Sequence, residues 1–418
     1  MSAPSKRTNA RHQAEEHLEE LARLADTAGA DVVGRLTQLL DRPHPATYLG
    51  SGKVEELKEL IQQLNATLVV FDDELTPAQG KNIEEIVHTR VMDRAELILD
   101  IFATRARSSE ARMQVEVAQL EYMLPRLTRM WTHLEKFRGG IGMRGPGETQ
   151  LETDRRLIQH RIRVLKERLV DVERAREIQR QGRKTHFRVA LVGYTNAGKS
   201  SVLRAMANDN AVFVEDRLFA TLDPLTREVE IGDGYTVLLT DTVGFIRKLP
   251  HHLVASFRAT LAEAKEADLL LHVIDASHEV WEEHRDVVDR VLTELGLADR
   301  PMLYIMNKMD AVLPEEVDAL RARVGNLAPG SIFASALSPD GLDTLRSALR
   351  DAVRSQRPLL EIRIPAANGR LIAEIHRDGE VLDQRADEDV MVVIARLDER
   401  SIGRLRHAGA RITVTSAA

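Results

Sequence analysis

The sequence predicts an α/β protein built from several units, and three observations support this prediction. An apolar, β-branched run at residues 187–192 leads into a glycine-containing loop and then a segment of helical character. Further apolar runs alternate with helical segments on both sides of it. Between residues 113 and 172, apolar side chains recur at the spacing of paired helices. Alternating strands and helices indicate helices packed on the faces of a mostly parallel sheet.

Length and composition limit the number of domains and the class of protein that the chain can form. The 418 residues suffice for about three domains with cores of their own, and 43% hydrophobic residues is ordinary for a globular chain. Without cysteine, no disulfide framework can form. The sequence has no apolar run of membrane-spanning length and no basic leader followed by an apolar stretch, so we expect a cytoplasmic protein without a membrane span.

Charge is distributed unevenly along the chain. The formal net charge is −7, yet residues 104–184 hold 19 Lys and Arg against 11 Asp and Glu. That segment therefore carries +8 and leaves −15 on the remainder. This basic segment is a second candidate functional region.

The N-terminal part, residues 1–106, reads as a small α/β domain that follows a frayed polar start at residues 1–12. Thr76 is the expected N-cap of one of its helices, with Pro77 in the first turn. The predicted elements are a helix at 14–28, a strand at 31–37, a helix at 54–64, a strand at 67–71 and a helix at 76–87.

Residues 50–53, Gly-Ser-Gly-Lys, allow two interpretations. They could form a second phosphate-binding loop or simply the turn that starts a helix. No apolar strand leads into them and the glycine spacing differs from that of a phosphate loop, so we favour the helix start.

Residues 107–184 predict two helices that fold back on each other as an antiparallel coiled-coil hairpin. Pro125 should kink the first helix. The first apolar seam is Met113, Val117, Leu120, Leu124, Leu127, Trp131 and Leu134, and the second is Leu151, Ile158, Ile162, Leu165, Leu169 and Val172.

The predicted tip of the hairpin is residues 138–150, which contain five glycines. So many glycines cannot build a core, but bare backbone and guanidinium groups can approach phosphates or unstacked RNA bases. The alternative is a solvated, flexible turn. The candidate RNA-facing residues are Arg138, Gly140, Arg144, Gly145, Gly147 and Gln150.

Residues 193–200, Gly-Tyr-Thr-Asn-Ala-Gly-Lys-Ser, match a phosphate-binding loop. Gly193 and Gly198 give the backbone freedom to turn N–H groups inward at a helix N-terminus, where the dipole favours anions. Lys199 can then reach the outer phosphates, and the Ser200 hydroxyl can ligate Mg²⁺. An ordinary glycine turn is the alternative, which the flanking strand and helix patterns disfavour.

Later strands end in residues suited to the rest of a nucleotide. The strand at 237–240 leads to Asp241, placed to hold Mg²⁺ through water, and to Gly244, whose N–H can meet a terminal phosphate. Runs at 269–275 and 302–306 read as parallel strands. Such loops at consecutive strand ends predict one site at one edge of the sheet.

The second of these runs ends in residues 307–310, Asn-Lys-Met-Asp. The Asp310 carboxylate can accept two hydrogen bonds from the ring N–H and the amine of guanine, whereas adenine offers no such pair. After a short strand at 332–333, residues 335–337 can offer N–H groups to the guanine carbonyl. The motif set therefore predicts GTP as the ligand.

Together these motifs resemble those of HflX-type ribosome-associated GTPases, within the translation-factor-related P-loop GTPases. The resemblance covers essentially residues 30–357. The residues that carry it are 71–75 (FDDEL), 144–150 (RGPGETQ), 193–200 (GYTNAGKS), 219–224 (FATLDP) and 241–245 (DTVGF).

The resemblance implies roles for further residues. Thr221 would be the switch threonine that ligates Mg²⁺ and senses the γ-phosphate, and the tip would face RNA of the large ribosomal subunit. Phe245 stands where small GTPases often carry a water-orienting glutamine. The family has this substitution too, so we expect slow intrinsic turnover and dependence on a partner.

The full prediction for the site includes catalytic, metal-binding and nucleotide-binding roles. Lys199, Thr221 and Gly244 are the catalytic candidates, and Ser200, Thr221 and Asp241 (through water) are the Mg²⁺ candidates. The nucleotide-binding candidates are Gly193, Tyr194, Thr195, Asn196, Ala197, Gly198, Lys199, Ser200, Ser201, Phe219, Ala220, Thr221, Leu222, Asp223, Asp241, Thr242, Val243, Gly244, Asn307, Lys308, Met309, Asp310, Ser335, Ala336 and Leu337.

The P-loop GTPase domain is expected at residues 185–357, after the α/β domain and the hairpin. Residues 358–418 follow as a small α+β domain of βαββαβ order. Its predicted strands are 360–364, 381–385, 391–397 and 411–414, with helices ending near 376 and 407.

We expect a Mg²⁺-dependent GTP hydrolase, monomeric when free, that binds the large ribosomal subunit and docks on, splits or remodels ribosomes. Two alternatives stay open: a GTP-dependent RNA remodeller that does not act on intact ribosomes, and a nucleotide-switched scaffold that pairs through its coiled coil. RNA docking should weaken steeply with salt, whereas apolar helix pairing should not.

Overall fold

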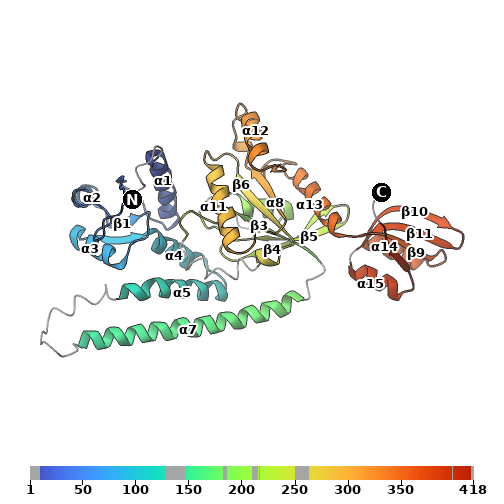
Figure 1. Cartoon of the computed structure of the whole chain (residues 1–418), viewed down its shortest axis with the longest axis horizontal. Helices are drawn as coiled ribbons and strands as arrows, with labels where there is room; N and C mark the ends of the chain where they lie inside the picture. The colour runs from blue at the N-terminus through green and yellow to red at the C-terminus, as the bar shows by residue number, and fades with distance from the viewer. Residues whose placement is uncertain are drawn as a thin grey trace.

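The computed structural model describes residues 10–127, 146–181, 186–209, 215, 217–249, 263–397 and 399–415. The chain forms an elongated molecule, with an N-terminal α/β unit at one end, a C-terminal unit at the other and a six-stranded sheet between them (Figure 1). A pair of helices lies along the N-terminal and central units. Within the described ranges, no helix is long and apolar enough to cross a membrane.

The N-terminal unit surrounds a short parallel sheet. Thr76 caps one of its helices as predicted, because its hydroxyl accepts the Gln79 N–H while the Gln79 side chain accepts the Thr76 N–H. Residues 50–53 form the start of a helix, the interpretation favoured above. The elements are α1 (Ala10–Thr27), α2 (Ser51–Leu64), β1 (Leu68–Phe71), α3 (Pro77–Val87), β2 (Arg90–Asp93) and α4 (Arg94–Arg105).

The strand predicted at residues 31–37 is not found among the described residues, apart from one β-bridge position at Thr37. The segment is extended, but the described sheet contains only β1 and β2, which pair in parallel. Residues 31–36 make no backbone hydrogen bond to another described segment, and a strand exists only where a neighbour completes the ladder. The sequence also failed to indicate β2 and α4.

Helices α5 (Ser109–Met123) and α7 (Pro146–Gln181) pack side by side and antiparallel (Figure 1). As expected for a helix that meets Pro125, α5 ends at Met123 and continues as a 3₁₀ turn, η1 (Leu124–Arg126). The predicted seam of α7 is the less exposed face, with Leu165 only 1% exposed. Helix α5 is buried more widely, because it also contacts α4.

The range predicted for the hairpin tip, residues 138–150, includes residues that belong to α7. Helix α7 begins at Pro146, a favourable first helical residue, so residues 146–150 are helical and not part of a loop. Gly147 and Gln150 therefore lie in the first turns of α7. Arg138, Gly140, Arg144 and Gly145 lie outside the described residues.

The central unit confirms the predicted α/β fold class. Its sheet has the order β4-β5-β3-β6-β7-β8, and every neighbouring pair is parallel except β4 with β5. Strand β4 was not predicted. The elements are β3 (Phe187–Gly193), α8 (Lys199–Ala207), β4 (Leu225–Gly232), β5 (Tyr235–Asp241), β6 (Leu269–Asp275), α11 (Trp281–Glu294), β7 (Met302–Asn307), η3 (Met309–Ala311), α12 (Val317–Leu327), β8 (Ile332–Phe333) and α13 (Asp343–Gln356).

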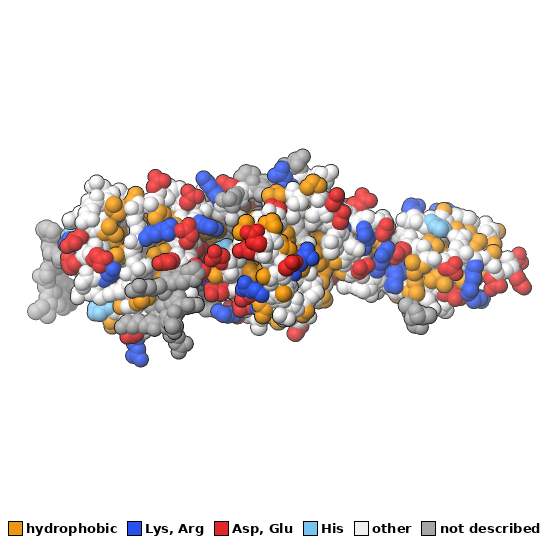
Figure 2. All heavy atoms as spheres, turned by 90° about the horizontal axis from the view of Figure 1, so that it is seen from above, with side chains coloured by type: hydrophobic (Ala, Val, Ile, Leu, Met, Phe, Trp, Pro, Cys, Tyr) orange, Lys and Arg blue, Asp and Glu red, His pale blue; other side chains and the backbone are white. Residues whose placement is uncertain are grey.

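The C-terminal unit has the predicted βαββαβ order. Its antiparallel sheet, β10-β11-β9-β12, packs one face on its two helices. The molecule narrows where this unit joins the central one (Figure 2), and there Glu380 accepts the Tyr235 hydroxyl at 2.5 Å. The elements are β9 (Leu359–Pro365), α14 (Gly369–Asp378), β10 (Glu380–Asp387), β11 (Val390–Arg396), α15 (Glu399–His407) and β12 (Arg411–Val414).

Candidate functional site

The loop between β3 and α8 has the backbone geometry of a phosphate-binding loop. Gly193 and Gly198 adopt φ of +153° and +93°. A Cβ at Gly193 would lie 2.2 Å from the Val273 carbonyl oxygen, and one at Gly198 would lie 2.3 Å from Nδ2 of Asn307. Both conformation and space therefore require glycine. The loop opens onto the N-terminus of α8, where helix dipole and N–H groups favour anions.

Lys199 begins α8 with its side chain folded back over this loop. Its Nζ donates to the carbonyl oxygens of Tyr194 at 2.8 Å and Gly193 at 3.3 Å. Burial lowers the pKa of Lys199 to about 8, against the opposing effect of Asp241. The ammonium is thus positioned where phosphate oxygens could replace the carbonyls as its partners.

Three side chains from separate segments converge beside Lys199. The hydroxyls of Ser200 and Thr221 donate to Oδ2 of Asp241 at 2.6 and 2.8 Å, and they lie 2.9 Å from each other. Burial raises the pKa of Asp241, while Lys199 and the two hydroxyls oppose that rise. The three predicted metal-site residues therefore share one cluster.

This cluster fits a small, hard cation. Hydroxyl and carboxylate oxygens are the ligands that Mg²⁺ prefers, usually with several waters. Oδ1 of Asp241 is buried and has no hydrogen-bond partner within the described part of the chain, so it has an acceptor position to offer. In the described ranges no three His, Cys, Asp or Glu residues form a metal-binding group, and any cation here would depend on hydroxyls, water and phosphate.

The segment after β5 packs directly against the phosphate loop. A Cβ on Gly244 would lie 2.6 Å from Cα of Thr195, and 3.0 Å from Nζ of Lys199. Phe245 exchanges backbone hydrogen bonds with the loop, donating to the Gly193 carbonyl at 3.0 Å and accepting from the Thr195 N–H at 2.7 Å. Its ring is buried in the core at 1% exposure, so it has no means of orienting a water.

The predicted base-reading residues meet at the ends of β7 and β8. Asn307 links both loops, because its Nδ2 donates to the Ala197 carbonyl at 3.0 Å and its Oδ1 accepts the Ala336 N–H at 3.2 Å. Asp310 accepts the Ser335 hydroxyl at 2.5 Å. The carboxylate is thereby fixed beside the cavity.

One cavity of about 390 Å³ joins these parts. Glu215, Arg217 and Ala311 also line it, and no sequence pattern had pointed to them. The predicted residues that line it are Thr195, Asn196, Gly198, Lys199, Ser200, Ser201, Phe219, Ala220, Thr221, Thr242, Gly244, Asn307, Lys308, Asp310, Ala336 and Leu337.

Other predicted residues shape the site from behind or lie away from it. Asp223 accepts the backbone N–H groups of Arg107 and Ser108, at 3.0 and 3.2 Å, next to the start of α5. Leu222 and Val243 are buried in the core. The predicted residues that do not line the cavity are Gly193, Tyr194, Ala197, Leu222, Asp223, Asp241, Val243, Met309 and Ser335.

A buried ionic cluster connects the N-terminal unit to the segment after Gly244, and no sequence pattern predicts its ion pairs. Asp72, fully buried, accepts from Arg94 at 2.7 Å and from Lys248 at 2.6 Å. Burial would raise the pKa of Asp72, but these two cations hold it below its usual value. Nearby, the Tyr194 hydroxyl donates to Glu20 of α1.

Three family models match the chain in succession. They are described as GTP-binding GTPase N-terminal (residues 15–103), GTP-binding GTPase Middle Region (105–183) and 50S ribosome-binding GTPase (188–308).

Two relatives indicate the same family as these models. GTPase HflX of Flavobacterium psychrophilum is 52% identical over 73% of this chain and 73% of its own length. GTPase HflX of Magnetococcus marinus is 46% identical over 93% and 90%. A GTP-binding protein of Sulfolobus solfataricus, solved with GDP, is 25% identical over 84% and 98%, with a TM-score of 0.44. The chain belongs to the HflX family of GTPases.

Proposed function

We propose that this protein hydrolyses GTP in the cavity between β3, β5 and β7, with Mg²⁺, and that it uses the nucleotide state to dock on and remodel or split ribosomes through the large subunit. The observation that carries the proposal is the convergence on one cavity of a buried lysine, a hydroxyl and carboxylate cluster and the Asp310 carboxylate.

Each part of the site has a distinct task. The glycine loop cradles phosphates with backbone N–H groups, and Lys199 neutralises charge on the outer phosphates. Ser200 and Thr221 would hold Mg²⁺ directly, and Asp241 would hold it through water; the ion would supply further charge neutralisation. Asp310 reads the guanine edge. Phosphoryl transfer requires positioning and electrostatic stabilisation more than a covalent catalyst. The loop N–H groups, the lysine and the metal-site residues are suited to these two tasks.

Basal turnover should be slow. Phe245 is buried in the core, so attack geometry is left to solvent and to backbone groups near Gly244 and Thr221. A partner that orders these groups would accelerate hydrolysis.

The large ribosomal subunit is the partner we propose. The family model that matches residues 188–308 is described as 50S ribosome-binding GTPase, and the basic segment at residues 104–184 would supply cationic groups for RNA. The helix pair of α5 and α7 lies along the side of the molecule (Figure 1), and the segment that joins the two helices is the part we propose to contact RNA.

The base-reading role predicts a change of nucleotide preference in Asp310→Asn. The amide can no longer accept two hydrogen bonds from guanine, but it can donate to the extra carbonyl of xanthine. We expect GTP affinity to fall about 100-fold, as for loss of a charged hydrogen-bond pair, with xanthosine triphosphate now preferred in competition binding. An unchanged preference for GTP would remove Asp310 from base recognition.

The lowered pKa of Lys199 predicts a pH dependence of GTP affinity. Phosphate oxygens favour the charged ammonium, so binding raises its pKa from about 8 and takes up a proton above that pH. Affinity should be nearly constant below pH 7 and fall up to about tenfold by pH 9. Fluorescent-nucleotide titrations would measure this. Lys199→Met should bind weakly at every pH without this fall; the same slope in both proteins would contradict the assignment.

Docking through the tip predicts stimulation by large subunits. GTP turnover should rise when subunits are added, and Arg138→Glu combined with Arg144→Glu should reduce the stimulated rate about tenfold or more through lost phosphate contacts. Basal turnover and GTP affinity should not change. Arg168→Glu combined with Arg174→Glu, at exposed positions of α7, is the control with the same change of charge. If large subunits stimulate both variants equally, docking must take place through another surface.

A further inference from the structure

The switch segment, which we define as residues 217–223, lies between the nucleotide cavity and the turn that joins α4 to α5. On the cavity side, the Thr221 hydroxyl donates to Asp241. The Phe219 N–H donates to Oγ1 of Thr195, in the phosphate loop, at 3.0 Å. On the other side, the segment contacts α4 and the start of α5. One short segment therefore touches both the nucleotide site and the beginning of the helix pair.

An apolar contact with α4 fixes the middle of the switch segment. The Phe219 ring meets the Phe102 ring edge-on, with centroids 4.6 Å apart and planes at 76°. Phe219 is 2% exposed, and its φ is +55°. A bulky residue keeps such a strained conformation only where the surrounding contacts outweigh the strain. The packing against α4 therefore holds Thr221, two residues further on, in a defined place.

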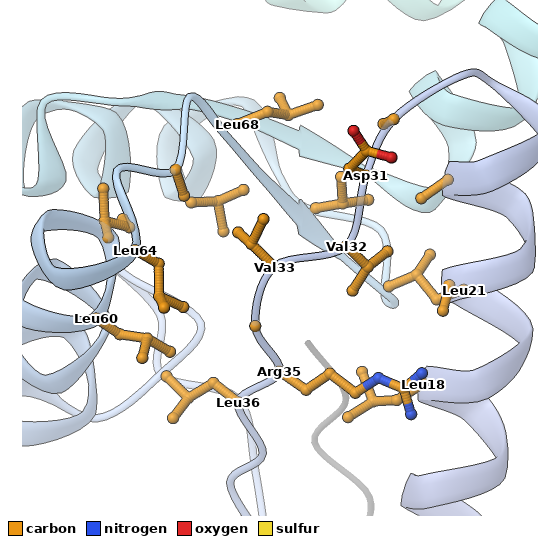
Figure 3. Close-up of a pocket in the computed structure, with 18 of the residues that line it drawn as sticks. Leu18, Leu21, Asp31, Val32, Val33, Arg35, Leu36, Leu60, Leu64 and Leu68 are labelled. Carbon is orange, nitrogen blue, oxygen red and sulfur yellow. The ribbon is translucent and has the colours of Figure 1, made fainter.

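The core cluster that includes Phe219 continues into the N-terminal unit. It contains Ile98 of α4 and Leu18 and Leu21 of α1, which are all buried. Leu18 and Leu21 also line the hollow between α1, β1 and α2 (Figure 3). Because closely packed cores deform little and transmit strain, the N-terminal unit gives the switch segment a rigid support.

Polar contacts with the turn between α4 and α5 lie on both sides of Phe219. Just before the switch segment, Glu215 pairs with Arg105, the last residue of α4, at 2.6 Å. At its end, Asp223 accepts the N–H groups of Arg107 and Ser108 at 3.0 and 3.2 Å. The Ser108 hydroxyl also donates to Asp223. These contacts tie the switch segment to the turn.

The Asp223 carboxylate lies at the N-terminus of α5. Ser108 is the N-cap of this helix, and its hydroxyl accepts the Ala111 N–H at 3.0 Å. The helix dipole favours a negative charge at this end, and hydrogen bonds to a carboxylate are roughly twice as strong as neutral ones. Asp223 does not line the nucleotide cavity. Its observed contacts therefore give it a role toward α5.

Helix α5 connects this contact to the rest of the helix pair. It packs along α7, where Leu165 is 1% exposed, and Arg161 of α7 pairs with Glu116 of α5 at 2.6 Å. Packed helices and ion pairs of this kind carry energetic coupling between distant sites. A change in the orientation of the pair therefore acts on Asp223, which is two residues from Thr221.

We propose that Asp223 is a positioning residue for GTP hydrolysis: by binding the N-terminus of α5, it ties the placement of Thr221 to the orientation of the helix pair. This inference rests on the proposed function, because it assumes that Thr221 contacts Mg²⁺ and senses the terminal phosphate. Bound GTP would then tighten the contact between Asp223 and α5. Conversely, an α5 that holds Asp223 would favour GTP over GDP by the same free energy.

The test measures amide hydrogen exchange of residues 107–111 and nucleotide affinity in the full chain with Mg²⁺. Guanylyl imidodiphosphate, a non-hydrolysable GTP analogue, should slow this exchange about threefold or more relative to GDP. Asp223→Asn keeps the shape of the side chain but removes its charge, so this difference should disappear. Its affinity for the analogue should fall about fivefold or more, while its affinity for GDP stays within about twofold of the parent.

Variants of the partner and of a distant carboxylate complete the test. Ser108→Ala removes a donor to Asp223 and should reproduce the effects of Asp223→Asn, whereas Ser108→Thr keeps the hydroxyl and should behave as the parent. Asp233→Asn is the matched control, because Asp233 is exposed and pairs with Arg354 of α13 at 3.1 Å. It should change neither exchange nor the two affinities.

Thr221→Ala separates failure of this proposal from failure of the proposed function. If Thr221→Ala lowers analogue affinity but Asp223→Asn does not, Asp223 is not a positioning residue and the proposed GTP site stands. If Thr221→Ala leaves analogue affinity unchanged, the role of Thr221 and this inference are both wrong. The proposal also fails if Asp223→Asn loses GDP and analogue affinity equally, or if both nucleotides give the parent the same exchange at residues 107–111.

Discussion

Asp241 ends β5 with its carboxylate 1% exposed, and the two hydroxyls that donate to it come from different segments. Ser200 belongs to α8, whereas Thr221 belongs to the segment that precedes β4. An isolated buried carboxylate is costly unless it is hydrogen-bonded. The two hydroxyls that donate to Asp241 therefore fix the position of the phosphate loop relative to the segment around Thr221. The remaining oxygen, Oδ1, has no hydrogen-bond partner among the described residues, so it can accept from a water that binds a cation.

A second buried carboxylate, that of Asp72, fixes the far end of the segment that begins at Asp241. Lys248, four residues after Gly244, pairs with Asp72 of the N-terminal unit, which Arg94 also neutralises. Removing one partner of a buried pair typically costs about 3–5 kcal/mol, because the remaining charge is left unpaired. The segment from Asp241 to Lys248 is thus held between the central sheet and the N-terminal unit. This stretch links the nucleotide cavity to the N-terminal unit, as does the hydrogen bond from Tyr194 of the phosphate loop to Glu20 of α1.

The parts of the fold that could be predicted are those that depend on local sequence. The phosphate loop, the ends of β5 and β7 and the seam of α7 follow from glycine positions, β-branched runs and helical spacing. Residues 31–36 have the same strand-like composition but pair with no strand among the described residues, and composition alone does not show which neighbour a strand will have. Contacts between residues far apart in the chain could not be predicted either. Asp72 and Lys248 form an ion pair although they are 176 positions apart. Asp223 belongs to a nucleotide-binding motif, yet it contacts the start of α5.

The Mg²⁺ dependence of GTP binding tests the account of the site most directly. With the parent protein, Mg²⁺ should strengthen GTP affinity by about tenfold or more, because Ser200, Thr221 and Asp241 then share the ion with the phosphates. In Asp241→Asn, most of that gain should disappear, while affinity without Mg²⁺ stays within about threefold of the parent. If Asp241→Asn kept the full gain, the buried cluster would not be the metal site, and the role assigned here to Ser200, Thr221 and Asp241 would be wrong.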